Sequence, residues 1–148
     1  MKIPGIVIAA SASGSGKTAV TMAMMKAFKN AGKKVRACKC GPDYIDPMFH
    51  REVLGIDSEN LDLYFCDRER LKERFMHHAE GAELVVTEGV MGYYDGISLD
   101  SDQASTYDVA RTLGFPVILV VPARGMASTI LAVLKGMIEY RNDSNIRG

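Results

Sequence analysis

The sequence lacks an excess of charge of either sign. Its 148 residues carry 18 Lys and Arg side chains against 18 Asp and Glu, so the formal net charge is zero at pH 7. This balance excludes the broad basic surface by which proteins hold nucleic acid or anionic membranes through bulk attraction. Any anion that the protein binds must therefore be held by a local site.

Long hydrophobic runs and paired cysteines are also missing. The longest apolar stretches, such as Val117–Val121, are far shorter than the roughly 20 residues that cross a bilayer, and the amino end lacks the pattern of a secretion signal. The three cysteines, Cys38, Cys40 and Cys66, are an odd number without a second pair to complete a zinc site, so we expect reduced thiols. These features predict a soluble, cytoplasmic protein that binds neither nucleic acid nor membrane.

The hydrophobic pattern, in contrast, is strong and predicts one compact α/β domain. Hydrophobic residues make up 47% of the chain, and short apolar runs alternate with segments of 3.6-residue periodicity, as in a parallel sheet with crossover helices. We expect strands at Ile3–Ala10, Lys34–Lys39, Leu84–Thr87 and Val117–Val121, and helices at Lys17–Ala31, Asp67–Glu80, Thr106–Leu113 and Met126–Tyr140.

Two segments are expected to lack regular structure. The loop Cys40–Pro47 contains a glycine and two prolines, which disfavour helix and strand. Arg141–Gly148 is short and polar and comes where the alternation requires another strand, so the last helix is predicted to have no strand after it. We therefore expect the chain to be a fragment of a longer protein.

The first loop has the composition of a phosphate-binding loop. Ser11–Thr18 lies between an apolar strand and an amphipathic helix, the context that the G-x-x-x-x-G-K-[ST] pattern requires, although Ser11 replaces the first glycine. The glycines allow backbone N–H groups to turn inward around a phosphate, and the helix N-terminus adds partial positive charge. The alternative is a simple turn with a solvated lysine. We expect nucleotide contacts from Ser13, Gly14, Ser15, Gly16, Lys17, Thr18 and Ala19.

A carboxylate at the end of a later strand is needed to help position Mg²⁺ beside the threonine hydroxyl. Glu88 directly follows the apolar strand Leu84–Thr87. Because the carboxyl ends of parallel strands share one rim, we expect Glu88, the first loop and the loop after Lys39 to converge there. The alternative for Glu88 is a carboxylate solvated at a strand end.

Four stretches resemble the amino-terminal synthetase domain of the cobyrinic acid a,c-diamide synthase family: residues 10–18, 41–47, 88–96 and 123–127. The resemblance spans nearly the whole chain, and the second and third stretches are its specific part. It implies a P-loop NTPase-like fold of the dethiobiotin synthetase type, with a mostly parallel sheet and helices on both faces, here truncated. Residues 1–148 would then be the amino-terminal part of the ATP-binding synthetase domain.

The resemblance also implies a reaction. Family members use ATP and Mg²⁺ to amidate the a and c side-chain carboxylates of a corrin-type tetrapyrrole in cobalamin biosynthesis. Each carboxylate is phosphorylated and then attacked by ammonia, which a glutamine amidotransferase domain supplies. The implied catalytic residues are Lys17, Asp43, Asp46 and Asp95, and the implied metal-binding residues are Thr18, Asp46 and Glu88.

The sequence departs from the family pattern at two positions. Ser11 replaces a common threonine but keeps a hydroxyl, and Pro122 stands where an aspartate is usual. The later synthetase strands and the amidotransferase domain of the family have no counterpart in these residues. The resemblance is also compatible with a homodimer.

The sequence is also compatible with other functions. Amidation of nickel sirohydrochlorin would use the same motifs, whereas dethiobiotin synthetase is disfavoured by residues 41–47. A partition-type ATPase would carry an extra lysine early in the loop, where this chain has serine and alanine. The fragment could also be a nucleotide-binding module without turnover.

For some further residues the sequence allows two roles, and for others it favours a structural role. Tyr93 and Tyr94 either stack on a macrocycle or pack over the sheet end, and Arg124 either neutralises a substrate carboxylate or is solvated. A structural or solvated role is expected for the three histidines, since they lack metal-ligand spacing: His50, His77 and His78.

Overall fold

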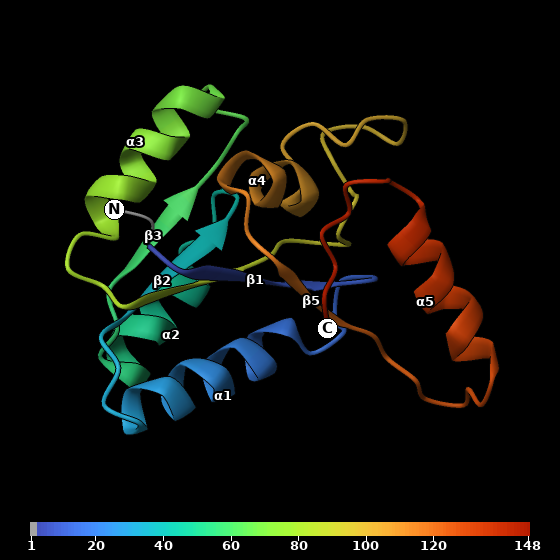
Figure 1. Cartoon of the computed structure of the whole chain (residues 1–148), viewed down its shortest axis with the longest axis horizontal. Coiled ribbons are helices and arrows are strands. Elements are labelled where there is room, and N and C mark those ends of the chain that lie inside the picture. Colours follow the sequence, from blue (N-terminus) through green and yellow to red (C-terminus); the bar gives the residue numbers. More distant parts are fainter. Residues whose placement is uncertain (1–2) are drawn as a thin grey trace.

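The computed structural model describes residues 3–148 and shows a five-stranded parallel sheet with helices packed around it (Figure 1). The strand order is β3-β2-β4-β1-β5, which places β2, β4 and β1 inside the sheet. The predicted α/β class is therefore confirmed. The strands are β1 (Gly5–Ala10), β2 (Val35–Cys40), β3 (Ser58–Leu61), β4 (Leu84–Glu88) and β5 (Val117–Val120).

Helices cover both faces of this sheet, as expected. In Figure 1, α1 and α2 lie along one face and α3 and α4 along the other, while α5 stands beside the β5 edge. The helices are α1 (Lys17–Asn30), α2 (Ile45–Leu54), α3 (Arg68–His78), α4 (Thr106–Leu113) and α5 (Thr129–Glu139).

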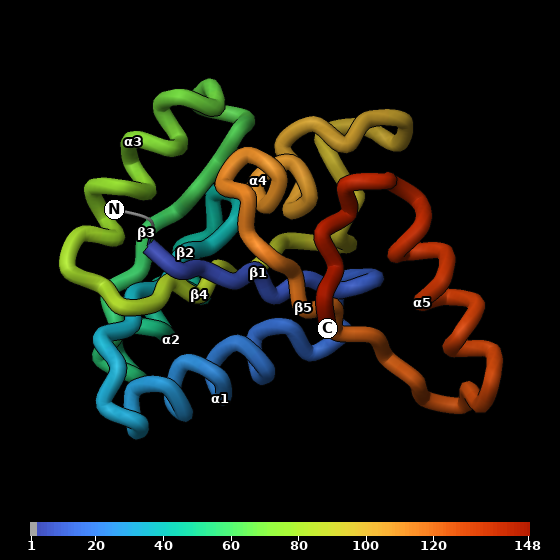
Figure 2. Tube along the Cα trace, viewed as in Figure 1, coloured from blue at the N-terminus to red at the C-terminus, as the bar shows by residue number. Residues whose placement is uncertain are grey.

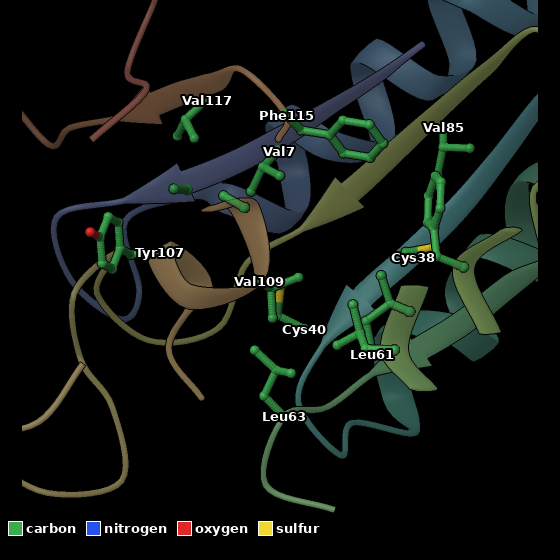
Figure 3. Close-up of a cluster of buried hydrophobic side chains, with 14 of the residues drawn as sticks. Val7, Cys38, Cys40, Leu61, Leu63, Val85, Tyr107, Val109, Phe115 and Val117 are labelled. Atoms are coloured by element: carbon green, nitrogen blue, oxygen red, sulfur yellow. The ribbon is translucent and has the colours of Figure 1, made fainter. Parts of the chain in front are cut away.

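Each face of the sheet has its own hydrophobic core. Successive strand residues point to opposite faces, so Val7 joins the cluster under α3 and α4 whereas Ile8 joins the cluster under α1 and α2. The larger cluster, shown in Figure 3, brings Tyr107 and Phe115 together with small side chains of β2 and β4. Because both faces are covered, the strands read as continuous apolar runs rather than alternating ones.

The expectation that the segment after β2 is irregular up to Pro47 is wrong. Helix α2 begins at Ile45, and β3 follows it as an edge strand that the sequence reading missed. Pro47 is the third residue of α2, where a missing N–H is tolerated because the first-turn amides have no partner within the helix. The polar sequence of β3, Ser-Glu-Asn-Leu, carries little strand signal.

No strand follows the last helix in the part of the chain that the structure describes, as predicted, but the segment after α5 pairs with β5 through an isolated parallel bridge between Val117 and Ile146. The amide of Val117 donates to the Asn145 carbonyl at 2.9 Å, and the amide of Arg147 donates to the Val117 carbonyl at 2.8 Å. The Leu119 amide then bonds to the Gly148 carbonyl at 2.8 Å. Residues 145–148 thus run beside β5, as the red end of the trace in Figure 2 shows.

Two helix ends are fixed by capping residues. The Asp67 side chain accepts a hydrogen bond from the Arg70 amide at 2.8 Å at the start of α3, and Gly114 adopts φ 68° at the end of α4, as a helix-terminating glycine does. Helix α5 has no buried residue. Within residues 3–148, no helix combines the length and hydrophobicity needed to span a membrane.

The three thiols differ in burial, and this difference predicts their reactivity. Cys38 and Cys40 are fully buried, and burial raises the pKa of the Cys40 thiol to about 12. Cys66 is partly exposed, although burial also raises its pKa. We expect Cys66 alone to react with a thiol reagent in the native protein and all three cysteines to react in denaturant, as measured by Ellman titration. Three equivalents of rapid reaction before denaturation would contradict the packing.

Candidate functional site

The carboxyl ends of β1, β2 and β4 form the rim at which the predicted loops meet. The strand register aligns Glu88 at the end of β4 with Ile8 on β1 and with Lys39 on β2. Side chains at aligned positions of neighbouring strands lie on the same face of a sheet. Lys39 and Glu88 therefore face the side that carries α1 and α2.

The first loop has the open, amide-lined shape that a phosphate needs. Gly14 and Gly16 have φ values of 71° and 89°, a left-handed conformation that favours glycine. A Cβ added at either position would meet no atom within 4 Å, so the space in front of the loop is free. The first turn of α1 carries no acidic residue and no side-chain cap. Its amides and the helix dipole are thus available to an anion.

Three further residues, in the loop and the first turn of α1, lie near these glycines. Ser13 and Ala19 are exposed, and the Ser15 hydroxyl donates to the Ala12 carbonyl at 2.8 Å. This last bond holds the loop in its turn. The structure places all the predicted nucleotide-contacting residues on the same loop and first turn of α1.

Lys17 is folded into the rim rather than solvated. Its ammonium donates to the carbonyl of Met91 at 2.7 Å and to that of Ala12 at 3.3 Å, and the residue is only 9% exposed. Burial and the charge of Lys39 lower its pKa. The alternative reading of a turn with a solvated lysine is therefore wrong.

Thr18 and Glu88 meet directly. The Thr18 hydroxyl donates to Glu88 Oε1 at 2.6 Å, and the glutamate is 1% exposed. The other oxygen of this carboxylate, Oε2, lies 3.2 Å from Nε2 of His50. Glu88 is thus not solvated at a strand end, but is fixed on both oxygens inside the rim.

Asp43 and Asp46 lie around one buried lysine. The Lys39 ammonium is 3.4 Å from Asp43 Oδ2 and 3.6 Å from Asp46 Oδ2, and Lys39 is 3% exposed. Burial and the nearby charge of Glu88 raise the pKa of Asp46 to about 6. Burial pushes the pKa of Asp43 upward, but hydrogen bonds from the Ile45 amide and the charge of Lys39 outweigh it, so the net pKa is lowered.

Asp95 belongs to the same rim but faces solvent. Its Oδ2 accepts a hydrogen bond from the Gly92 amide at 2.8 Å. The loop that carries it stays attached to β1, because the Tyr93 amide donates to the Ala10 carbonyl at 2.8 Å. The charge of Asp95 acts on Lys17 and opposes the lowering of its pKa.

The sequence gives no functional role to three polar residues that lie at the rim or next to it. Lys39 appeared merely as the end of a strand, and Ser58 lies on the unpredicted β3. His50 is fully buried, as a structural residue would be. However, its ring contacts Glu88, which belongs to the site. The sequence contains one signal for these residues, which is the lysine near the end of β2. A buried lysine needs a carboxylate partner, so its position predicts an acidic residue nearby.

The tyrosines of the glycine-rich loop pack rather than face the rim. Tyr93 is 1% exposed and donates to the Ser144 carbonyl at 2.6 Å, and Tyr94 donates to the Met137 carbonyl at 2.7 Å. Their rings lie 4.7 Å apart. The packing alternative is therefore correct for both. Arg124 is exposed, which leaves both of its readings open.

The donor set suits Mg²⁺ in the company of a nucleotide. Within residues 3–148, no group of three or more His, Cys, Asp or Glu side chains is placed to hold a metal ion by itself. Mg²⁺ in phosphate-transfer sites instead uses one or two protein oxygens together with phosphate oxygens and water. The adjacent oxygens of Thr18 and Glu88 meet this requirement, with Asp46 on the same rim.

Comparisons with known proteins agree with this geometry. Residues 6–140 match the family described as "CobQ/CobB/MinD/ParA nucleotide binding domain". A cobyrinate a,c-diamide synthase of Thermoplasma volcanium is 43% identical over 97% of this chain and 31% of the relative. That of Gloeobacter violaceus is 44% identical over 97% of this chain and 32% of the relative.

A hydrogenobyrinate a,c-diamide synthase of Streptomyces coelicolor is 42% identical over 99% of this chain and 30% of the relative. The chain thus spans about a third of the length of the curated relatives that it matches. Among solved structures, hydrogenase maturation factor HypB from Archaeoglobus fulgidus has a TM-score of 0.49 at 14% identity, covering 91% of this chain and 90% of its own.

Proposed function

This chain belongs to the family of CobQ/CobB/MinD/ParA nucleotide-binding domains, and we propose that it is the ATP-binding part of an amidoligase that acts on cobyrinic acid or a close relative. In this reaction, ATP phosphorylates a side-chain carboxylate of the tetrapyrrole, and ammonia then displaces the phosphate to form an amide. The curated relatives bear the names of cobyrinate and hydrogenobyrinate a,c-diamide synthases. The cofactors would be ATP and Mg²⁺.

One observation carries the proposal: a phosphate loop and a group of carboxylates lie on the same rim. Thr18 contacts Glu88 at the loop, while Asp43 and Asp46 surround Lys39 at the end of the adjacent strand. A nucleotide-binding module without turnover needs only the first group. The second group could position an acceptor carboxylate beside the γ-phosphate, with a cation between the negative charges.

The residues of the chain would mainly position the reactants and neutralise charge. Mg²⁺ and the triphosphate supply the transferable phosphoryl group. Lys17 would leave the Met91 carbonyl to contact the terminal phosphates, and Thr18 and Glu88 would hold the metal. Lys39 can offset the negative charge of an incoming carboxylate, whereas Asp43 and Asp46 limit how closely it approaches without a cation.

A cavity beside the acidic loop offers room for the rest of the substrate. It has a volume of about 660 Å³ and extends from Asp43 and Tyr44 along β3 to α3, which is within the usual range for small-molecule sites. Arg51 and Arg70 line it, and neither forms an ion pair with a carboxylate in the described part of the chain. Guanidinium groups suit the multiple carboxylates of the proposed macrocycle.

Substitution of these arginines should weaken binding of the macrocycle and spare the nucleotide. We expect Arg51→Gln and Arg70→Gln each to raise the KM for the tetrapyrrole about tenfold, the loss of one charged hydrogen bond. The affinity for ATP, measured by calorimetry, should not change. Lys72→Gln, on the same helix as Arg70 but outside the cavity, is the matched control. An unchanged KM in both arginine variants would place the macrocycle elsewhere.

The reaction itself is tested by following an oxygen atom. The full-length protein is incubated with ATP, Mg²⁺, ammonia and cobyrinic acid labelled with oxygen-18 in its carboxylates. Transfer of the label to inorganic phosphate, together with amide formation seen by mass spectrometry, is expected if a phosphorylated carboxylate forms. Parallel reactions with nickel sirohydrochlorin and with GTP identify the preferred acceptor and nucleotide. Binding of ATP without any acceptor-dependent phosphate release would reduce the protein to a binding module.

The remaining parts of the enzyme belong to the same proposal. We place residues 1–148 in the amino-terminal part of the synthetase domain, with a glutamine amidotransferase domain elsewhere in the full protein as the source of ammonia. A homodimer is compatible with this arrangement. The cytoplasm, a reducing compartment, suits its three unpaired thiols.

A further inference from the structure

A chain of four polar side chains connects the edge strand β3 to the phosphate loop. Ser58 Oγ lies 3.0 Å from Nδ1 of His50, whose Nε2 lies 3.2 Å from Glu88 Oε2, and Glu88 Oε1 accepts from Thr18 at 2.6 Å. Three of these residues are buried, with exposures of 7% for Ser58, 0% for His50 and 1% for Glu88. The chain crosses β3, α2, β4 and α1 in turn.

The hydrogen-bonding capacity of each group sets the direction of the bonds. A carboxylate only accepts hydrogen bonds, so the Nε2 atom of His50 must carry a hydrogen toward Glu88. In a neutral ring the Nδ1 atom is then an acceptor, and the Ser58 hydroxyl can donate to it. Ser58 thus favours the tautomer that Glu88 requires.

From this arrangement we infer that His50 is a positioning residue for the Mg²⁺ site. Its bond to Oε2 fixes the plane of the Glu88 carboxylate and turns Oε1 toward the Thr18 hydroxyl. A buried carboxylate without this donor would lose a partner that water cannot replace. Outer partners of this kind commonly change metal affinity by about 10–100-fold when removed.

Two substitutions at His50 separate positioning from packing. Glutamine places its amide nitrogen near the location of Nε2 and can still donate to Glu88, whereas the shorter asparagine ends near the location of Nδ1 and reaches only toward Ser58. Both insert a polar amide into the same buried site. The pair therefore differs mainly in whether Glu88 keeps its donor.

The inference rests on the proposed nucleotide and Mg²⁺ site, but its test contains no macrocycle. In the full chain, ATP affinity is measured by calorimetry at increasing Mg²⁺ concentrations, and the concentration that gives half of the maximal increase in affinity is determined. ATP affinity without metal is measured in EDTA. We expect His50→Asn to raise this concentration about 10–100-fold and His50→Gln to stay within about threefold of the unaltered protein. Affinity in EDTA and melting temperature should match between the two variants.

The tautomer gives a second readout that a purely structural role would not move. Nitrogen-15 NMR of the His50 ring should show the hydrogen on Nε2 in the unaltered protein, and also in Ser58→Ala and Ser58→Thr, because the Glu88 carboxylate still requires a donor there. Equal Mg²⁺ requirements in the two His50 variants, or a hydrogen on Nδ1 in the unaltered protein, would overturn the inference. If the unaltered protein binds ATP equally well with and without Mg²⁺, the metal site itself is refuted. If only the proposed amidation reaction is not observed, the role of His50 at the metal site still stands.

Discussion

Replacement of Lys17 by alanine will reduce ATP affinity by about 100-fold or more, because a charged hydrogen bond to phosphate contributes about 1.5–3 kcal/mol and lysine makes more than one. Lys17 is the one ammonium that the first loop carries, and it is already folded into the rim, 2.7 Å from the Met91 carbonyl. Calorimetric titration with ATP and Mg²⁺ measures the loss, and phosphate release should fall below detection.

The matched control for this experiment is Lys26→Ala. Lys26 lies on the same helix, α1, but is exposed and away from the loop, so its removal should leave ATP affinity unchanged. Circular dichroism and thermal melting show whether each variant retains the fold. Normal nucleotide affinity in folded Lys17→Ala protein would refute the assignment of the phosphate loop.

The parts of the fold that the sequence predicts are those in which local signals and tertiary packing agree. The strand before the first loop is apolar because both of its faces are buried, and α4 ends where Gly114 can adopt a positive φ. The phosphate loop is predictable because its glycines, lysine and threonine act within a few residues of one another.

Other parts depend on contacts that no local pattern contains. The sequence does not predict helix α2, because Pro47 usually disfavours a helix, although the first turn tolerates it. Strand β3 is polar and is held by its pairing with β2. The partner of His50 lies 38 residues away at Glu88, so only the fold reveals the pair. The same holds for Lys39, whose acidic partners are set by the turn into α2.

The two acids beside Lys39 are not equivalent tests of catalysis. Asp43 accepts the Ile45 amide at 2.8 Å and so helps to begin α2, and its backbone carbonyl is held by Asn60. A substitution there would change both the helix and the site. Asp46 is already within α2, and its carboxylate lies 3.6 Å from the Lys39 ammonium. It is therefore the cleaner position at which to remove a charge.

Asp46→Asn is expected to lower the rate of amidation about 100-fold while ATP affinity stays within about threefold, since the lost charge acts on the acceptor and the metal rather than on the loop amides. The change keeps the shape of the side chain, and Asp43 remains to pair with Lys39. Amidation is followed by mass spectrometry in the full-length enzyme, with nucleotide binding measured in parallel.

The exposed Asp100, which lies outside the rim, supplies the control variant Asp100→Asn. It should match the unaltered enzyme in both measurements. Full amidation activity in Asp46→Asn would remove this carboxylate from the mechanism. A loss of ATP affinity as large as that of Lys17→Ala would instead assign Asp46 to the nucleotide site. The rim would then not be divided into a nucleotide side and an acceptor side.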